Sequence, residues 1–179
     1  MNLKLKRTPG IYLVGFMAAG KSTVGRHLAH RLGWNFFDID KEIEAAEKLT
    51  IAELFETRGE PEFRRIEADI LWQHVRWIER GRPAVLALGG GAFAAGTNRE
   101  LIEENGVSVW LDCPFPTVQR RVAQQHGGLL RPLARDPVEF EALFRRRLEI
   151  YQLAHMRVAI EGDDPEQTVD AILAGPYFQ

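Results

Sequence analysis

A phosphate-binding loop is predicted at residues 15–22. The run Gly15-Phe16-Met17-Ala18-Ala19-Gly20-Lys21-Ser22 fits the pattern G-x-x-x-x-G-K-[ST]. In such a loop the glycines let backbone N–H groups face phosphate oxygens, the lysine reaches the outer phosphates, and the serine hydroxyl binds Mg²⁺. The apolar run 11–14 predicts the strand before the loop, and Val24, Leu28 and Leu32 predict the helix after it. The sequence therefore indicates a nucleotide site formed by this loop and Thr23.

Two carboxylates follow the next apolar run, residues 36–37. Asp38 and Asp40 lie two positions apart, so in an extended chain both would point the same way. Beside a phosphate loop they favour a functional interpretation, because Mg²⁺ needs oxygen ligands and a phosphoryl acceptor needs a group near its hydroxyl. The alternative is that Asp40 caps a helix that begins at Lys41.

Glycines and arginines mark the second half of a possible anion site. Residues 89–91 are three glycines directly after the apolar run 84–88, and they would bring bare backbone to the edge of the sheet. A flexible turn is the alternative for these glycines.

The charged run 59–67 begins a predicted helix and is typical of a solvated face. Arginines that an anion site could use lie in three further places: Arg120 and Arg121, Arg131, and Arg145 to Arg147.

The elements that position these residues predict an α/β fold. Apolar runs at 11–14, 36–37, 84–88, 107–111 and 156–160 alternate with helical patterns. Such runs indicate a five-stranded parallel sheet that is covered on both faces, with the site at the carboxyl ends of the strands. We expect a single domain over residues 1–179. Residues 124–137 contain two glycines and two prolines with no clear period, which predicts a long loop that acts as a lid.

Composition limits the partners and the compartment. The formal net charge is −2 over 179 residues, which argues against a nucleic acid or an anionic membrane as partner. The single cysteine, Cys113, forms no intramolecular disulfide and suits a reducing compartment. We therefore expect a cytoplasmic protein that acts as a monomer on a small molecule.

Taken in order, these motifs resemble the shikimate kinase family over nearly the whole chain. The resemblance rests on the phosphate loop, residues 37–40, Gly59-Glu60 with residues 63–67, the glycine triplet, Arg131-Pro132-Leu133, and Arg147 four residues before Tyr151. It implies a three-layer P-loop kinase fold with a mobile lid. It also implies transfer of the γ-phosphoryl group of ATP, with Mg²⁺, to the 3-hydroxyl of shikimate, in the route to chorismate and aromatic amino acids. Another small-molecule kinase, gluconate-like or nucleoside-monophosphate-like, is the alternative.

The resemblance also implies a role for each site residue. Lys21, Asp40 and Arg131 would be catalytic, with Arg131 on the lid. Ser22 and Asp38 would serve the metal. The nucleotide would contact Gly15, Ala18, Ala19, Gly20, Lys21, Ser22 and Thr23, with its base between Arg121 and Pro165. Shikimate would contact Asp40, Arg64, Gly89, Gly90, Gly91 and Arg147, the two arginines binding its carboxylate.

Two positions depart from the family pattern. Ala18 stands where a glycine is common, and alanine at a positive φ would cost roughly 1 kcal/mol, so we expect an ordinary φ at this residue. Ala134 follows Arg131-Pro132-Leu133 where a larger apolar residue is usual, which affects the details of lid closure and not the arginine.

Overall fold

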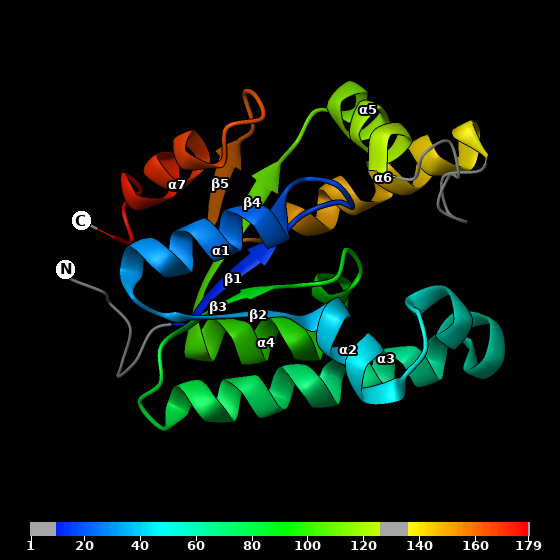
Figure 1. The fold of residues 1–179 in the computed structure, drawn as a ribbon, viewed down its shortest axis with the longest axis horizontal. Coiled ribbons are helices and arrows are strands. Elements are labelled where there is room, and N and C mark those ends of the chain that lie inside the picture. The colour runs from blue at the N-terminus through cyan, green and yellow to red at the C-terminus, as the bar shows by residue number, and fades with distance from the viewer. Residues whose placement is uncertain (1–9, 126–135, 179) are drawn as a thin grey trace.

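The computed structural model describes residues 10–125 and 136–178. All five predicted strands are present and form one parallel sheet in the order β2-β3-β1-β4-β5 (Figure 1). Their bounds are β1 Gly10–Val14, β2 Asn35–Asp38, β3 Ala84–Ala87, β4 Gly106–Asp112 and β5 Met156–Ala159. The predicted α/β class is therefore confirmed.

The middle strands carry the core. Every residue of β1 and β3 is buried, which is the reason their sequences are continuously apolar rather than alternating. Gly10 pairs in register with Ala84 on one side and with Gly106 on the other. Because all five strands run the same way, their carboxyl ends meet at one edge of the sheet.

Helices cover both faces of the sheet. In Figure 1, α1 (Lys21–Leu32) and α7 (Pro165–Leu173) lie on one side, and α3 (Ile51–Glu79) and α4 (Gly96–Asn105) lie on the other. The other helical elements are α2 (Ile39–Glu47), η1 (Ala92–Ala94), α5 (Phe115–Gln125) and α6 (Pro137–Tyr151). The result is the predicted three-layer arrangement.

The long helix predicted from residue 59 is present as the second part of α3, since Gly59, with φ 79° and ψ 167°, separates it by a kink from a first part. That first part was not predicted; it begins at Ile51, where Thr50 and Glu53 form a capping box. The loop predicted over 124–137 stays a prediction; α5 ends at Gln125 and α6 begins at Pro137. Residues 126–135, which include Arg131 and Ala134, lie outside the described residues.

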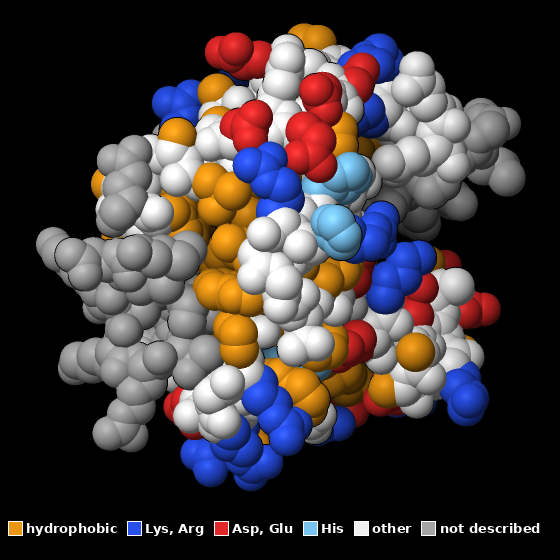
Figure 2. All heavy atoms as spheres, turned by 60° about the vertical axis from the view of Figure 1, so that its left-hand side comes forward, with side chains coloured by type: hydrophobic (Ala, Val, Ile, Leu, Met, Phe, Trp, Pro, Cys, Tyr) orange, Lys and Arg blue, Asp and Glu red, His pale blue; other side chains and the backbone are white. Residues whose placement is uncertain are grey.

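Charged pairs join α1 to α7 on the surface. His27 Nδ1 lies 2.6 Å from Glu166 Oε1, and Arg31 donates to Glu166 at 3.0 Å and to Asp170 at 2.8 Å. Figure 2 shows acidic, basic and histidine side chains close together in the upper part of one face of the molecule.

Among the helices of the described segments, none is both long and apolar enough to cross a membrane.

Two fully buried tyrosines differ in how their hydroxyl groups are satisfied. Tyr151 Oη donates to Gly90 O at 2.6 Å, whereas Tyr12 Oη has no hydrogen-bond partner within the described part of the chain. Burial raises the pKa of both phenols, so both are neutral at working pH. A buried hydroxyl without a partner loses its bonds to water and gains nothing in exchange.

We expect Tyr151→Phe to lower the free energy of unfolding by about 1 kcal/mol, because it removes a buried hydrogen bond. Tyr12→Phe removes a buried hydroxyl that forms no hydrogen bond with the described residues. This change should leave the free energy of unfolding unchanged or raise it by up to about 1 kcal/mol. Urea unfolding measures both. Equal losses in the two variants would contradict this assignment.

Candidate active site

The phosphate loop connects β1 to α1 and has the conformation that its glycines predict. Gly20 caps α1 with φ 97°, and a Cβ at Gly15, where φ is 150°, would lie 2.8 Å from Leu111 O. Lys21 Nζ donates to Gly15 O at 2.6 Å and to Phe16 O at 2.9 Å. The loop carbonyls therefore bind the ammonium group, at the start of a helix whose N-terminus favours anions.

The expectation of an ordinary φ at Ala18 is wrong. Ala18 has φ 60°, the left-handed region in which a Cβ approaches its own carbonyl oxygen. Its carbonyl accepts a bond from Arg121 Nη1 at 3.0 Å, and Ala19 N donates to Phe16 O at 3.2 Å. The surrounding contacts therefore hold the alanine in a conformation that glycine would adopt more easily.

Asp38 joins the phosphate loop to α2. Its Oδ2 accepts a hydrogen bond from the Ser22 hydroxyl, and its Oδ1 accepts from Lys41 N at 3.2 Å as the cap of α2. The alternative in which Asp40 caps a helix from Lys41 is thus wrong, because the helix begins at Ile39 and Asp40 lies in its first turn. The two carboxylates are not on one extended strand, and they face different parts of the site.

Asp40 lies beside Glu67 at the glycine triplet. A Cβ at Gly89 would be 2.7 Å from Asp40 Oδ1 and 2.9 Å from Glu67 Oε2. Glu67 is 1% exposed, and within the described residues its Oε2 has no hydrogen-bond partner. Burial, with a smaller contribution from the Asp40 carboxylate, raises the pKa of Glu67, and the Arg64 and Arg147 charges oppose this shift.

Arg64 and Arg147 converge on Gly91. A Cβ there would lie 2.2 Å from Arg64 Nη2 and 2.6 Å from Arg147 Nη1. Because φ at Gly91 is −104°, glycine is required here for space and not for a left-handed conformation. Arg64 Nη1 donates to Glu67 Oε1 at 2.7 Å. Both arginines line a cavity of about 540 Å³, so two cationic groups are available to one anion.

The glycine triplet also meets the phosphate loop. Gly90 O accepts from Arg147 Nη1 at 3.1 Å and from Tyr151 Oη at 2.6 Å. A Cβ at Gly90 would lie 3.8 Å from Met17 N and from Gly15 O. The predicted phosphate and carboxylate sites are therefore neighbours at one edge of the sheet.

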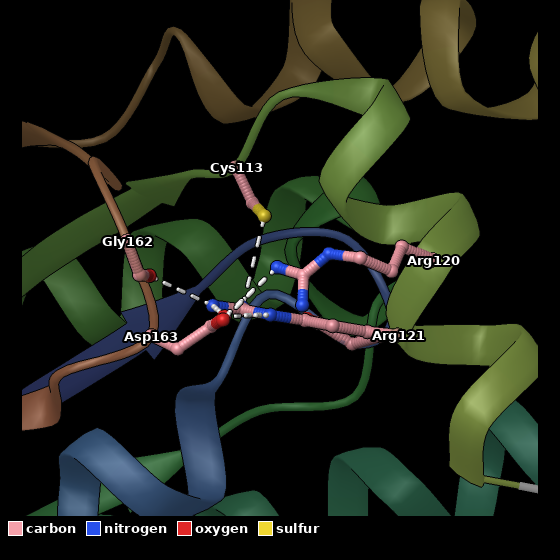
Figure 3. A network of polar contacts seen from close by, with 6 residues as sticks. Cys113, Arg120, Arg121, Gly162 and Asp163 are labelled. Carbon is pink, nitrogen blue, oxygen red and sulfur yellow. Dashed lines mark hydrogen bonds and ion pairs between the residues drawn. The ribbon is translucent and has the colours of Figure 1, made fainter.

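Arg121 contacts the phosphate loop at Ala18, whereas the glycine triplet approaches the loop at Gly15 and Met17. Arg121, on α5, donates to Ala18 O and to Gly162 O, each at 3.0 Å, and to Asp163 Oδ1 at 2.9 Å (Figure 3). Pro165 is the first residue of α7, two positions after Asp163. The structure thus places Arg121 between the phosphate loop and residues 162–163. The contact of Arg121 and Pro165 with a nucleotide base stays a prediction.

Two residues of this site were not predicted. Glu67 was assigned to a charged run and read as solvated, although its position three residues after Arg64 on a helix places both side chains on one face. Asp163 had no sequence signal beyond its closeness to Pro165. Arg131, the predicted lid arginine, lies outside the described residues.

A parallel sheet whose first strand ends in a phosphate loop, with an anion pocket beside that loop, defines a small-molecule kinase of the P-loop class. The family model for shikimate kinase matches residues 17–175. A shikimate kinase of Persephonella marina is 42% identical over 167 residues, covering 91% of this chain and 96% of the relative. One of Ruegeria pomeroyi is 43% identical, covering 92% and 83%. The chain belongs to the shikimate kinase family.

A solved structure agrees with this assignment. The shikimate kinase from Acinetobacter baumannii, determined in complex with shikimate, is 36% identical and has a TM-score of 0.81, covering 93% of this chain and 91% of that one. The P-loop kinase fold implied by the sequence is therefore confirmed.

We expect Ala18→Gly to raise the free energy of unfolding of the ligand-free protein by about 0.5 to 1 kcal/mol. Relief of the left-handed strain, about 1 to 2 kcal/mol, exceeds the entropy that glycine adds to the unfolded chain, about 0.4 to 1 kcal/mol. Ala19→Gly is the matched control, because Ala19 is 1% exposed and its φ is not positive. The control should lose about 1 kcal/mol. Urea unfolding measures both variants. A lower free energy of unfolding in Ala18→Gly would contradict the inference that Ala18 is strained.

Proposed function

We propose that this chain transfers the γ-phosphoryl group of ATP to the 3-hydroxyl of shikimate. Family membership makes it an ATP-dependent kinase that acts on shikimate in the route to aromatic amino acids. The observation that supports the acceptor most directly is the convergence of Arg64 and Arg147 on Gly91, with Asp40 at the adjacent Gly89. A cyclic acid with ring hydroxyls needs cationic groups that bind its carboxylate and, on the other side of the ring, a carboxylate that accepts a hydrogen bond from a hydroxyl.

On the acceptor side, the two guanidinium groups bind the carboxylate and fix the ring. Each guanidinium group already donates a hydrogen bond within the protein, Arg64 to Glu67 Oε1 and Arg147 to Gly90 O. Asp40 then orients the 3-hydroxyl and accepts its proton as the new bond to phosphorus forms, while the backbone of the glycine triplet meets the other hydroxyls. The arrangement lowers the barrier mainly by positioning.

On the nucleotide side, the phosphate loop binds the triphosphate through backbone N–H groups of residues 15–23. Lys21 exchanges its bonds to Gly15 O and Phe16 O for the outer phosphate oxygens, and Arg121 and Pro165 contact the base. Because the transition state is loose and its charge spreads over the equatorial oxygens, Lys21 and Arg131 stabilise it electrostatically. The role of Arg131 rests on the sequence pattern alone.

The chemistry of Ser22 and Asp38 fits Mg²⁺. A hydroxyl and a carboxylate oxygen in direct contact are hard oxygen donors, and this metal is commonly bound by one or two such side chains together with substrate phosphates. When bound, the ion would neutralise charge on the phosphates.

We further propose that residues 1–179 form one domain and that the protein is a cytoplasmic monomer. We also propose that it has no nucleic-acid or membrane partner, which the net charge of −2 supports.

A coupled assay of ADP release tests the acceptor. Shikimate should be phosphorylated with a higher kcat/KM than quinate, gluconate or a nucleoside monophosphate, because the others lack either the same ring hydroxyl geometry or the ring carboxylate. Lys21→Met is the control for contaminating activity and should retain less than about a tenth of kcat/KM, a loss above about 1.4 kcal/mol. Faster turnover of gluconate or of a nucleotide would favour the alternative kinase.

Arg147→Ala and Arg131→Ala should affect different constants. Arg147→Ala removes a charge-assisted contact of about 2 to 3 kcal/mol to the ground-state carboxylate, so shikimate Kd should rise roughly 30- to 150-fold. Arg131→Ala should lower kcat by roughly two decades with only a few-fold change in shikimate Kd, since its contact strengthens in the transition state. Isothermal titration gives Kd, and steady-state kinetics gives kcat.

Arg145→Ala is the control for Arg147→Ala, because Arg145 lies on the same helix, is 72% exposed and pairs with Glu141. It should change shikimate Kd less than twofold. If Arg131→Ala weakened shikimate binding as much as Arg147→Ala while leaving kcat intact, Arg131 would belong to the acceptor pocket.

A further inference from the structure

The guanidinium of Arg121 is bound by three segments of the protein: the phosphate loop, Cys113 after β4, whose Sγ accepts from Nη1 at 3.8 Å, and residues 162–163. Nη1 donates to Ala18 O in the phosphate loop at 3.0 Å, and Nη2 donates to Gly162 O at 3.0 Å. Nε and Nη2 donate to Asp163 Oδ1 at 3.2 and 2.9 Å. The N–H groups of a guanidinium lie in its plane, so bonds from donors on several sides restrict the orientation of that plane and use its edges.

Asp163 is the negatively charged group among these partners. Its two oxygens also accept from Arg120 Nη2, at 3.0 and 3.1 Å, so one carboxylate lies between two arginines (Figure 3). Hydrogen bonds from Arg120 and Arg121 lower the pKa of Asp163 to about 2. The carboxylate is therefore ionised throughout the pH range of any assay.

The two arginines are not equivalent. The Arg121 side chain is 16% exposed and reaches the phosphate loop. The Arg120 side chain is 47% exposed and, among the described residues, its hydrogen bonds go to Asp163. Removal of Arg120 would leave every bond of Arg121 in place. Removal of the Asp163 charge would release one edge of Arg121 and leave the two carbonyl contacts.

We propose that Asp163 is a positioning residue that fixes the plane of Arg121 so that a planar nucleotide base can stack on its face. This inference rests on the proposed contact between Arg121 and the base. A guanidinium whose edge donors are already bonded stacks on aromatic rings through its faces. A free arginine side chain has about 2 kcal/mol of rotamer entropy to lose, and prior fixation reduces that cost on binding.

The proposal is tested with Asp163→Asn and two ligands, ADP and inorganic tripolyphosphate, by isothermal titration. ADP Kd should rise roughly three- to fivefold, the range expected for loss of an exposed charge pair, with a matching rise in KM for ATP. Tripolyphosphate, which has no base, should bind equally well or more tightly, because the substitution removes a nearby negative charge. Shikimate Kd and kcat should change less than twofold.

Arg120→Ala is the matched control and should change ADP Kd less than twofold. In an Arg121→Ala background, Asp163→Asn should have no further effect, since Asp163 acts through that arginine. The inference is overturned if Asp163→Asn leaves ADP affinity unchanged, or if it weakens ADP and tripolyphosphate equally. A failure of the underlying base contact is recognised separately, because Arg121→Ala would then leave ADP affinity unchanged.

Discussion

The close approach of two guanidinium groups to the backbone of Gly91 is the constraint on which the cavity beside the glycine triplet depends. Arg64 and Arg147 have like charges, and a Cβ at Gly91 would collide with both. Their approach is stabilised by Glu67, a buried carboxylate bonded to Arg64. The Glu67 side chain is 1% exposed and that of Arg64 29%, so loss of the arginine would leave a buried carboxylate without its cationic partner. The glycine and the glutamate are therefore needed together, one for space and one for charge.

Strand order brings the two halves of the site together. β1 lies between β3 and β4, so the phosphate loop after β1 is next to the glycine triplet after β3 and to the segment after β4. Asp38 ends β2, the neighbour of β3, and reaches Ser22 across that edge. Residues distant in sequence thus form one site because parallel strands end at the same edge of the sheet.

The sequence allowed the five strands and the phosphate loop to be predicted, because each depends on local pattern or on a motif. The motifs also singled out Arg64 and Arg147, which the structure brings together at Gly91. Strand order was not predicted, since apolar runs do not specify their neighbours. The alternative that Asp40 caps a helix from Lys41 is wrong, because Asp38 is the cap and the helix begins at Ile39. Residue type alone does not tell which of two nearby aspartates caps a helix. Glu67 was missed for a related reason: a charged run on a helix does not reveal which member is buried.

The two basic groups that we propose to contact the nucleotide differ in the hydrogen bonds that each would lose on binding. Lys21 is bound to Gly15 O and Phe16 O, so contact with a phosphate requires an exchange of one set of bonds for another. Arg121 is bound to Ala18 O, Gly162 O and Asp163 at its edges, and a base stacked on its face leaves those bonds intact. Exchanged bonds contribute only their difference, whereas a stacked face adds a contact without such a loss. In the proposed function, a fixed Arg121 would therefore favour affinity for the base, and the contact of Lys21 would be the net result of an exchange of bonds.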